Sequence, residues 1–433
     1  MSYRILVIDG QGETEAITLA KASGGKIEII RTFPICCSLG AFYDAASVYI
    51  GLGYDVAGKL MGLAPYGNPD QGRIIEFDEN TGEFRNKVTS INEKDGFFET
   101  YMKYVEYFEQ NCYPYNTACM ENTSTEELMT YVNFAASIQK NLDEVVIAMA
   151  RYLKKVTKCD NLIMSGGVSL NCTANGCLDR ENIFEKIFIY PPANDAGCAA
   201  GAALELAREQ GLFDEKVPER INNVYLGQFY TELDYSTAIR NSGFAYVHMN
   251  SMEEFTDKVA TLLQENKILG WFQDGFEYGP RALGARSIIC NPCNRENINK
   301  VNQAKIRELW RPLSPIVLDR FYDQIFVDDK PYNLSEFMLK TCEIKEEWLK
   351  RIPAVAHIDK TSRPQYLTRE ANPRMYAVLE KFYEKTRIPL IINTSFNVKA
   401  QPIVNSPREA LLALETNLKL DGLIIGDWYV YRK

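Results

Sequence analysis

The sequence predicts an α/β fold built in two successive units. Three observations predict it: strand-like apolar runs alternate with helix-period segments, one long helix has a continuous apolar face, and a polar stretch interrupts the alternation near mid-chain. The 433 residues provide room for two or three domains with large cores. We expect domains at 1–210 and 226–433, joined by a linker at 211–225 that contains Gly211 and Pro218.

The elements of the first unit follow from local patterns. An apolar strand at 4–8 ends at Asp9-Gly10, and residues 16–32 alternate around Gly24-Gly25, which predicts a hairpin. Apolar residues at three- and four-residue steps predict a helix over about 126–155. We then expect a strand at 161–164, a helix to Cys177, a strand at 187–189 and a helix at 196–209.

The second unit repeats the alternation. We expect helices at 252–265, 295–307, 373–386 and 407–416 and strands at 268–272, 314–318, 389–392 and 422–431.

Composition excludes several classes of protein. A net charge of −9 disfavours a nucleic-acid partner, which requires clustered Lys and Arg. No apolar run reaches 18 residues, so no membrane span is expected, and the N-terminus lacks the pattern of a signal peptide. Eleven cysteines in a chain of this length indicate reduced thiols and a cytoplasmic protein. Cys290 and Cys293 form a lone C-x-x-C, which is a weak zinc signal.

Three loops of the first unit combine glycines with aspartates. Residues 165–171 (SGGVSLN) lie where a strand turns into a helix, where backbone N–H groups suit a phosphate. Asp9 and Asp195 also follow strands, and carboxylates at such ends can hold a divalent metal beside a nucleotide. An ordinary tight turn and helix-capping aspartates remain the alternatives. Neither a P-loop nor a Rossmann glycine pattern is present.

Several loops of the second unit concentrate cations. Arg281 and Arg286 lie in a glycine-punctuated turn at 278–287, residues 305–312 (KIRELWRP) hold three cations, and Arg363 follows. Asn393 and Ser395 stand in NTSFN, placed directly after a strand. Arginine forks with hydroxyl and amide donors suit a phosphate or carbamoyl phosphate. The alternative is surface arginines paired with acidic neighbours.

These motifs resemble the O-carbamoyltransferases of the nodulation-factor and antibiotic-tailoring type. Residues 165–176 look like the family's AGGVALNCVANG, and 59–67 like its KxMGLAPYG. Further stretches look like GPRALGxRSI, KxREFRPLAP, HxDGTARxQ and LNTSFNxxGEPIV; they are 278–288, 305–315, 357–365 and 391–403. The resemblance implies a partial actin/sugar-kinase-like (RNase H-like) nucleotide-binding domain followed by a YrdC-like α/β domain.

The resemblance also implies chemistry and site residues. The YrdC-like domain would form carbamoyl adenylate from carbamoyl phosphate and ATP, and the actin-like domain would pass the carbamoyl group to a hydroxyl or amine of a small-molecule natural product. The residues expected to hold carbamoyl phosphate are Arg281, Lys305, Arg311, Arg363, Asn393 and Ser395. The expected nucleotide-site residues are Gly166, Gly167, Asn171 and Lys59. Asp9 and Asp195 would ligate a divalent metal, Fe²⁺ or Mg²⁺.

One departure from the family concerns its metal-binding histidines. The family carries an H-x-x-x-H pair on a segment before the strand that ends at Asp9. Here the only histidines are His248 and His357, and neither can replace that pair. We therefore expect a second polypeptide to supply that lobe. The alternatives are a chain that has lost transfer and kept only activation, a catalytically silent scaffolding subunit of a carbamoyltransferase complex and, less favoured by the acidic composition, tRNA threonylcarbamoylation.

Overall fold

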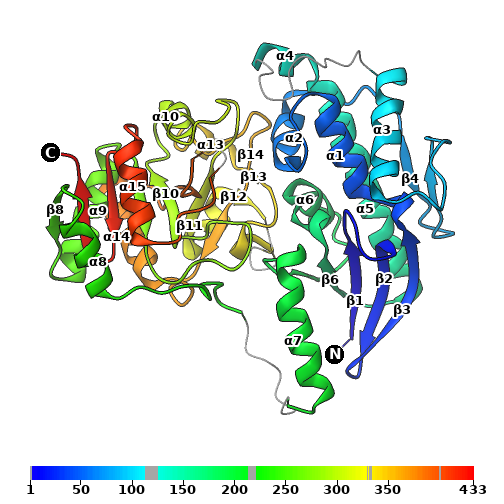
Figure 1. Ribbon diagram of the computed structural model, residues 1–433, viewed down its shortest axis with the longest axis horizontal. Helices are drawn as coiled ribbons and strands as arrows, with labels where there is room; N and C mark the ends of the chain where they lie inside the picture. The colour runs from blue at the N-terminus through cyan, green and yellow to red at the C-terminus, as the bar shows by residue number, and fades with distance from the viewer. Residues whose placement is uncertain (1, 113–124, 213–220, 329, 331–333, 399–400) are drawn as a thin grey trace. The chain divides into compact units, whose positions relative to one another are not determined.

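The computed structural model describes residues 2–112, 125–212, 221–328, 330, 334–398 and 401–433. Its contacts divide the chain into two units, drawn from blue to green and from green to red in Figure 1. The first is Met1–Asp214 with Leu339–Thr341, and the second is Glu215–Met338 with Cys342–Lys433. Part of the expected linker, 213–220 with Pro218, lies outside the described residues. The fold is mixed α/β with several sheets, as the sequence predicts.

The first unit is built on a five-stranded sheet with strand order β3-β2-β1-β6-β7. The first three strands are antiparallel, whereas β1, β6 and β7 are parallel. The bounds are β1 Ser2–Ile8, β2 Glu15–Ser23, β3 Lys26–Pro34, η1 Ile35–Cys37, α1 Leu39–Tyr49, α2 Ala57–Leu63, η2 Ala64–Tyr66, β4 Ile75–Phe77, β5 Phe84–Asn86, α3 Phe97–Asn111, α4 Thr125–Thr130, α5 Val132–Thr157, β6 Asn161–Ser165, η3 Gly167–Leu170, α6 Cys172–Arg180, β7 Lys186–Ile189, η4 Asp195–Gly197 and α7 Cys198–Glu209.

The core of this unit lies between the sheet and the helices. The predicted apolar face of the long helix is confirmed, because Ile138, Leu142 and Met149 of α5 are fully enclosed. Helices α1 and α3 lie side by side and join their rings, with Phe42 and Phe108 at a centroid distance of 5.9 Å (Figure 1). Aromatic pairs of this kind add to the stability that burial alone provides.

The second unit is built on an eight-stranded sheet, order β15-β11-β16-β10-β9-β17-β18-β8, with a smaller sheet β12-β13-β14. The bounds are α8 Glu232–Arg240, β8 Ala245–His248, α9 Met252–Gln264, β9 Leu269–Phe272, β10 Arg286–Cys290, α10 Glu296–Ala304, β11 Ser314–Leu318, η5 Asp319–Phe321, α11 Tyr322–Ile325, β12 Phe326–Val327, η6 Ser335–Phe337, β13 Cys342–Ile344, α13 Glu346–Leu349, β14 Thr361–Ser362, β15 Gln365–Leu367, α14 Pro373–Thr386, β16 Leu390–Ser395, α15 Pro407–Thr416, β17 Gly422–Ile425 and β18 Trp428–Tyr431.

Three predicted boundaries in this unit are wrong. The strand expected at 389–392 continues to Ser395, so Asn393 and Ser395 lie within β16 rather than after it. The helix expected to reach 307 ends at Ala304. The strand expected over 422–431 is a hairpin, because Gly426 adopts φ +53° between β17 and β18 and reverses the chain.

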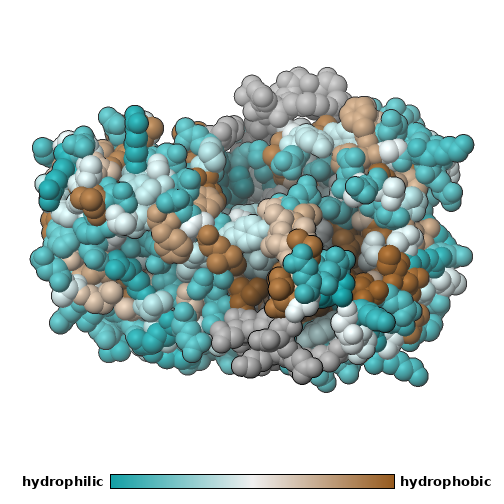
Figure 2. Space-filling model, turned by 60° about the horizontal axis from the view of Figure 1, so that its bottom comes forward, coloured by the Kyte–Doolittle hydropathy of each residue, from teal (hydrophilic) through white to brown (hydrophobic). Residues whose placement is uncertain are grey.

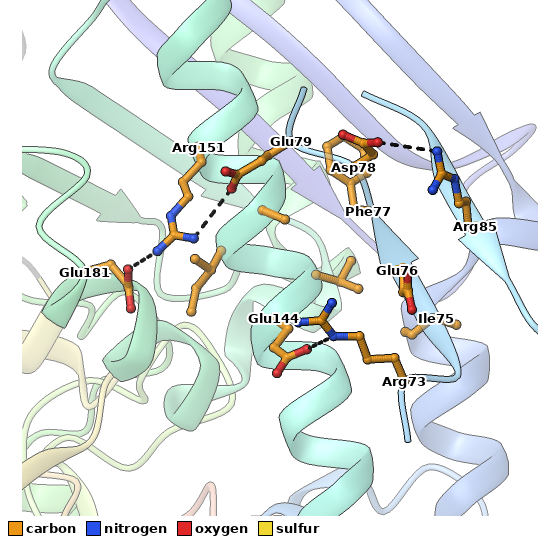
Figure 3. Close-up of a pocket in the computed structure, with 13 residues that line it drawn as sticks. Arg73, Ile75, Glu76, Phe77, Asp78, Glu79, Arg85, Glu144, Arg151 and Glu181 are labelled. Carbon is orange, nitrogen blue, oxygen red and sulfur yellow. Dashed lines mark hydrogen bonds and ion pairs between the residues drawn. The ribbon is translucent and has the colours of Figure 1, made fainter. Parts of the chain in front are cut away.

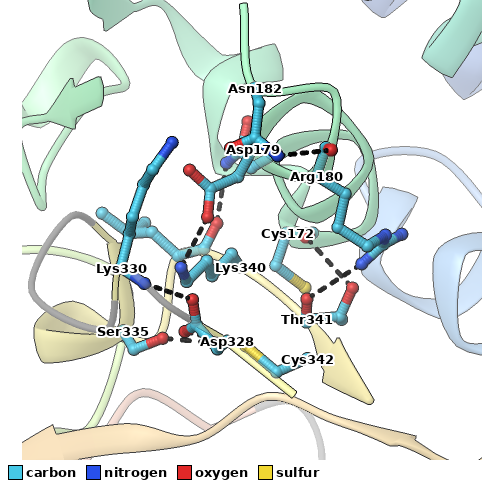
Figure 4. Close-up of polar contacts among 12 residues, drawn as sticks. Cys172, Asp179, Arg180, Asn182, Asp328, Lys330, Ser335, Lys340, Thr341 and Cys342 are labelled. Atoms are coloured by element: carbon cyan, nitrogen blue, oxygen red, sulfur yellow. Dashed lines mark hydrogen bonds and ion pairs between the residues drawn. The ribbon is translucent and has the colours of Figure 1, made fainter. Parts of the chain in front are cut away.

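A late segment of the chain packs on helix α6 of the first unit. The Thr341 N–H donates to the Cys172 carbonyl at 3.0 Å, and the Asn175 amide donates to the Leu339 carbonyl at 2.8 Å. The Lys340 ammonium lies 2.6 Å from the Asp179 carboxylate, and Figure 4 shows the two side chains pointing at each other. Both side chains are almost fully buried, at 2% and 8% exposure, so each charge depends on the other.

None of the described helices combines the length and apolarity needed to cross a bilayer.

Removing one member of the Asp179–Lys340 pair should destabilise the first unit. Lys340→Met leaves the Asp179 carboxylate buried and unpaired, so we expect its unfolding free energy to fall by about 3–5 kcal/mol in urea denaturation. The double variant with Asp179→Leu should recover most of the loss. Lys381→Met, which breaks the solvent-exposed pair with Glu384 at 2.9 Å, should leave the unfolding free energy nearly unchanged. Equal effects of Lys340→Met and Lys381→Met would contradict the account.

Candidate functional site

The loops singled out in the first unit meet at one edge of its sheet. Strands β1, β6 and β7 are parallel, so their carboxyl ends lie together. Val7 pairs with Ser165, and two residues further on Asp9 lies beside Gly167. One oxygen of the Asp9 carboxylate accepts from the Gly10 N–H at 2.8 Å and from the Gly167 N–H at 3.2 Å. The strand end at Asp9 and the glycine turn therefore form one constellation.

The two glycines of the turn are required by close packing against β1. A Cβ on Gly166 would lie 2.1 Å from the Ile8 carbonyl oxygen, and its φ of +89° disfavours any other residue. A Cβ on Gly167 would lie 3.3 Å from the Asp9 carboxylate. The Gly166 N–H donates to the Ala193 carbonyl at 2.8 Å, which fixes the turn to the loop before Asp195. Chain packing thus explains both glycines whether or not a phosphate binds.

Asn171 caps helix α6, a role that the sequence analysis did not assign to it. Its side chain accepts from the Ala174 N–H at 3.0 Å and donates to the Gln139 side chain at 3.2 Å. Gln139 in turn accepts from the Tyr43 hydroxyl at 2.6 Å. Burial raises the pKa of the nearby Asp143 carboxyl to about 6. Asn171 is therefore held rigidly, and its cap group is already occupied.

Lys59 lies on the short helix α2, next to the start of α6. Met61 of the same helix accepts from the Cys172 thiol at a sulfur–sulfur distance of 3.6 Å. A Cβ on Gly67 would lie 2.1 Å from the Val132 carbonyl oxygen. The last glycine of KxMGLAPYG is therefore needed because the chain packs closely against the start of α5 there. This packing places the Lys59 motif beside the Asn171 cap.

The described residues do not complete a metal site. Asp195 is exposed at the start of η4, and Asp9 already accepts two N–H groups. Among the described residues, no three His, Cys, Asp or Glu side chains gather closely enough to hold an ion. A metal on Asp9 and Asp195 would need further ligands from outside the described residues.

In the second unit, one face of the central strands is polar. Asn393 pairs with Ser314 of β11, and Ser395 pairs with Ser287 of β10, so these side chains share a face. Ile316 lies two residues after Ser314 on β11, on the same face, and pairs with Gln365 of β15. Gln365 therefore lies on that face as well. The Asn393 amide donates to the Ala282 carbonyl at 2.8 Å, while its own oxygen and the Ser287 hydroxyl are buried with no hydrogen-bond partner among the described residues. Unsatisfied polar atoms in a sheet that is otherwise apolar favour a ligand site.

Lys305 points at the end of this face. Its ammonium donates to the Ser395 carbonyl, lies 3.0 Å from the Ser395 hydroxyl, and is 2.7 Å from the Asn397 side-chain oxygen and 3.1 Å from the Asn397 carbonyl. The side chain is only 5% exposed. Since an ammonium has three N–H donors, these oxygens satisfy all of them. Lys305 and Ser395 are thus brought together as predicted, and Lys305 also fixes the loop after β16.

Lys305, Arg307, Arg311 and Arg363, the cation cluster, repel one another. Burial, with repulsion from Arg307 and Arg311, holds the pKa of Lys305 well below its usual value. Burial and Arg363 also lower the pKa values of Arg307 and Arg311. Glu308, 3.7 Å from Arg311, is the acidic neighbour that offsets this repulsion. The predicted residues Arg311 and Arg363 therefore share one locality, and Arg363 donates to Ser314 on the polar face at 3.2 Å.

The two arginines of the glycine-punctuated turn lie in different environments. Arg281 is half-buried beside Ala282, whose carbonyl accepts from Asn393. Arg286 is fully enclosed, donates to the carbonyls of Gln273 and Asp274, and its guanidinium lies 3.7 Å from the Phe272 ring centroid. Arg286 thus belongs to the core rather than to an anion site.

Buried Glu277 shapes this turn. One of its oxygens accepts from the N–H groups of Leu283, Ala285 and Arg286 at 2.8–3.1 Å. Burial raises the pKa of the Glu277 carboxyl, and these N–H groups oppose the shift. The composition of the turn did not reveal this role of Glu277. The roles of Arg307, Asn397 and Ser314 were also missed, although all three stand in the predicted motif stretches 305–315 and 391–403.

A separate concavity of the first unit, with a volume of about 500 Å³, holds none of the predicted residues. Figure 3 shows it lined by ion pairs: Arg73 lies 2.7 Å from Glu144, Arg85 lies 3.4 Å from Asp78, and Arg151 lies between Glu79 and Glu181. Its arginines are thus already paired with acids.

Comparison with known proteins connects both units to one family. The model "Carbamoyltransferase N-terminus" matches residues 2–204, and "Carbamoyltransferase C-terminus" matches 260–432. The nodulation protein NolO of Bradyrhizobium diazoefficiens is 31% identical over 99% of this chain and 75% of its own length. The chain belongs to the carbamoyltransferase family. The resemblance read from the motifs is confirmed.

Other relatives show how much of the family this chain spans. The nodulation protein NolNO of Sinorhizobium fredii is 32% identical over 99% of this chain, which covers 61% of NolNO. Among solved structures, full-length HypF in its phosphate- and nucleotide-bound form is 20% identical, with a TM-score of 0.31 over 44% of this chain and 23% of HypF. A likeness that small says nothing about what this chain binds.

The end of α10 provides a stability test beside the cation cluster. Ile306 has φ +50°, its N–H donates to the Gln303 carbonyl, and the Arg307 N–H donates to the Asn302 carbonyl, a helix-ending pattern that favours glycine. Ile306→Gly relieves the strain of the left-handed conformation but also increases the entropy of the unfolded chain. The first effect should be larger, so we expect the unfolding free energy to rise by about 0.5–1 kcal/mol in urea denaturation.

The matched control is Gln303→Gly, an exposed position inside the same helix. It should lower the unfolding free energy by about 0.5–1 kcal/mol. If Ile306→Gly were as destabilising as the control, contacts of the isoleucine side chain would outweigh the strain.

Proposed function

We propose that this chain acts in an ATP-dependent carbamoyltransferase. Its second unit forms carbamoyl adenylate from carbamoyl phosphate and ATP, and the carbamoyl group is then transferred to a hydroxyl or amine of a small-molecule natural product. The cation cluster beside the polar face of β16 carries the proposal, because it concentrates positive charge that a phosphorylated donor would neutralise. Family membership supports the carbamoyl group as the cargo.

Atom balance defines the products. Carbamoyl adenylate links the carbamoyl oxygen to the α-phosphorus of ATP, which releases pyrophosphate. The phosphate of carbamoyl phosphate leaves separately, so one water is consumed and one phosphate and one pyrophosphate appear per adenylate. Transfer to the acceptor then releases AMP. Cations near the departing phosphates stabilise the charge that develops on them.

The residues divide these tasks. Arg363, which donates to Ser314 on the polar face, and Arg311, which lies 3.7 Å from Glu308, would hold the donor phosphate with Arg281 at the neighbouring turn. Asn393 would orient the carbamoyl group through its unpaired buried oxygen. Lys305 and Ser395 would fix the loop and contribute charge.

We propose that the first unit is a partial actin-like nucleotide domain and the second a YrdC-like domain. The shared edge of β1, β6 and β7, with Asp9 beside Gly167, supports a nucleotide site in the first unit. A divalent metal there would polarise phosphate oxygens, held by Asp9 and Asp195 together with ligands from elsewhere. The free thiols of the described cysteines agree with a cytoplasmic location.

We propose that a second polypeptide supplies the metal-binding histidines and packs on the open sheet of the first unit. One row of apolar residues, the outer row, crosses all five strands on one face of this sheet. It consists of Ile29, Ala20, Ile5, Ile163 and Phe188. Ile29 is 62% and Phe188 40% exposed, and α7 has no buried residue. Brown patches are visible over the first unit in Figure 2. Apolar rows of this kind are typical of faces that another chain covers.

The activation reaction is testable directly. With carbamoyl phosphate present, we expect the chain to release pyrophosphate from ATP, measured by a coupled pyrophosphate assay and by ATP–pyrophosphate exchange. Lys305→Ala should lower the rate at least 100-fold, because it removes charge and frees the Ser395 loop. Lys300→Ala, exposed on helix α10 just before Lys305, should leave the rate unchanged. A catalytically silent scaffold would release no pyrophosphate even with its partner and all substrates present.

The partner surface is tested with the protein encoded immediately upstream, which we expect to carry an H-x-x-x-H motif. Co-expressed with this chain, it should form a complex on light scattering after gel filtration. Ile29→Lys or Phe188→Lys should weaken that complex about tenfold or more by placing charge on an apolar contact. Glu109→Lys, exposed on α3, should not. A complex that tolerates both outer-row variants would place the partner elsewhere.

A further inference from the structure

Strand β8 ends the eight-stranded sheet of the second unit, and its outer edge is open. Among the described residues it pairs with β18 alone, without a register shift. The side chains of Tyr246 and Val247 are 43% and 38% exposed. At the opposite end of the sheet η6 packs on β15, where Gln365 and Leu367 are 4% and 1% exposed. The second unit therefore covers one edge of its main sheet and leaves the other accessible (Figure 1).

The pairing with β18 shows which backbone groups face this open edge. The Met249 N–H donates to the Asp427 carbonyl at 2.9 Å, and hydrogen-bonding residues alternate along an antiparallel strand. Met249 and every second residue before it therefore face β18, whereas Tyr246 and His248 turn their N–H and C=O groups outward. No strand of the described part of the chain pairs with these outward groups.

The outward N–H groups on either side of this stretch are satisfied locally. The Phe244 N–H donates to the Ser242 hydroxyl at 3.3 Å, and the Asn250 N–H donates to the Glu254 carboxylate at 2.9 Å. These bonds confine pairing at the open edge to the stretch between Phe244 and Asn250. Residues 244–250 (FAYVHMN) contain no Lys, Arg, Asp, Glu or Pro, the residue types with which proteins commonly block a sheet edge.

The open edge is complementary to a second copy of itself. When two β8 strands run antiparallel about a twofold axis at Val247, the outward groups of Tyr246 meet those of His248 in the other copy, in both directions. The two Val247 side chains then lie directly opposite each other, and no like charges meet along the strands.

Helix α8 adds complementary charge at both ends of this pairing. The helix starts near the end of β8, because Glu232 lies 3.9 Å from the His248 ring, and it ends at Arg240, a short turn before β8 begins. Since α8 thus runs antiparallel to β8, Glu232 of one copy lies at the same end of the pairing as Arg240 of the other. Arg240 is exposed and has no ion pair among the described residues.

We propose that β8 is a self-association surface through which two copies of this chain form a twofold dimer with one sheet continuous across the interface. Val247 lies at the axis, and α8 of each copy flanks the joined strands. A contact of this length is small, so we expect a dissociation constant in the micromolar range. The proposal is independent of the proposed function, and an absence of pyrophosphate release would leave it intact.

Sedimentation velocity of the full chain from about 1 to 200 µM tests the dimer, which should replace the monomer as the concentration rises. Tyr246→Pro removes an outward N–H group, a loss that an edge strand otherwise tolerates, and should weaken the dimer at least about tenfold. Tyr246→Phe keeps the N–H group and the ring, so it should associate like the parent. A chain that stays monomeric throughout, or a Tyr246→Pro variant that associates as tightly as the parent, would overturn the proposal.

Because Tyr246→Pro could lose structure, a cross-linking variant provides a second test. Residues opposite each other at a non-hydrogen-bonded position of an antiparallel pair are close enough for a disulfide. Val247→Cys should therefore cross-link two copies in the presence of oxidised glutathione, with the bond mapped by mass spectrometry to position 247 of both. Glu415→Cys, exposed on α15, should cross-link no more than the parent, whose own exposed cysteines set the background. Equal cross-linking of the two variants would refute the antiparallel pairing.

The same measurements separate a second copy from another partner. If β8 pairs instead with the polypeptide proposed to cover the first unit, Tyr246→Pro would weaken that complex while this chain alone remains monomeric. That outcome would show the self-association proposal to be wrong.

Discussion

The second unit holds several positively charged side chains close together without an equal number of acidic neighbours, and this repulsion is the constraint on which its site depends. The cation cluster is kept in place by its surroundings: Asn302 closes the loop, Lys305 is clamped by Ser395 and Asn397, and Arg363 is fixed to Ser314. Each of these contacts opposes Coulomb repulsion that an empty site has to withstand. Burying cations in this way lowers stability unless an anion arrives, which is the usual cost of a preorganised site. The sheet supplies the rigidity, because β16 carries both Asn393 and Ser395 on one polar face.

A different constraint, close approach of backbones, governs the first unit. Gly166 touches the end of β1, and a Cβ on Gly40 would lie 2.5 Å from the Gly10 Cα, so the ends of separate elements are drawn around Asp9. Close packing leaves short loops at the parallel edge, and the N–H groups of Gly10 and Gly167 in them are used by Asp9. It also means that these glycines would be retained for packing alone. These glycines are therefore stronger evidence for the fold of the first unit than for a bound ligand.

The sequence predicted the elements whose signals are local. The 3.6-residue period of α5 and the turn chemistry at Gly24-Gly25 depend only on neighbouring residues, and both are present in the structure. Ile306 hid the true end of α10, because a β-branched residue at a left-handed position contradicts local preference. Arg286 looked like Arg281 in the motif, and only burial separates them. Leu339–Thr341 pack on α6, and Lys340 pairs with Asp179, so these contacts join residues some 160 positions apart. Local sequence patterns could not predict them, because such patterns compare only neighbouring residues.

The two sites differ in how much of their chemistry this chain supplies. In the second unit, the cations, the oriented amide of Asn393 and the clamp on the 305–311 loop all come from residues within one sheet and its adjoining loops. In the first unit, Asp9 is committed to two N–H groups and no third metal ligand is gathered among the described residues. Activation of a phosphorylated donor requires mainly positive charge in a fixed geometry, whereas transfer requires a second substrate and a complete cleft. Under the proposed function, activation would therefore depend on residues of the second unit, and transfer would depend on ligands from outside the described residues. The exposed apolar residues of the first unit's sheet and the unburied α7 lie in the unit that would need those ligands.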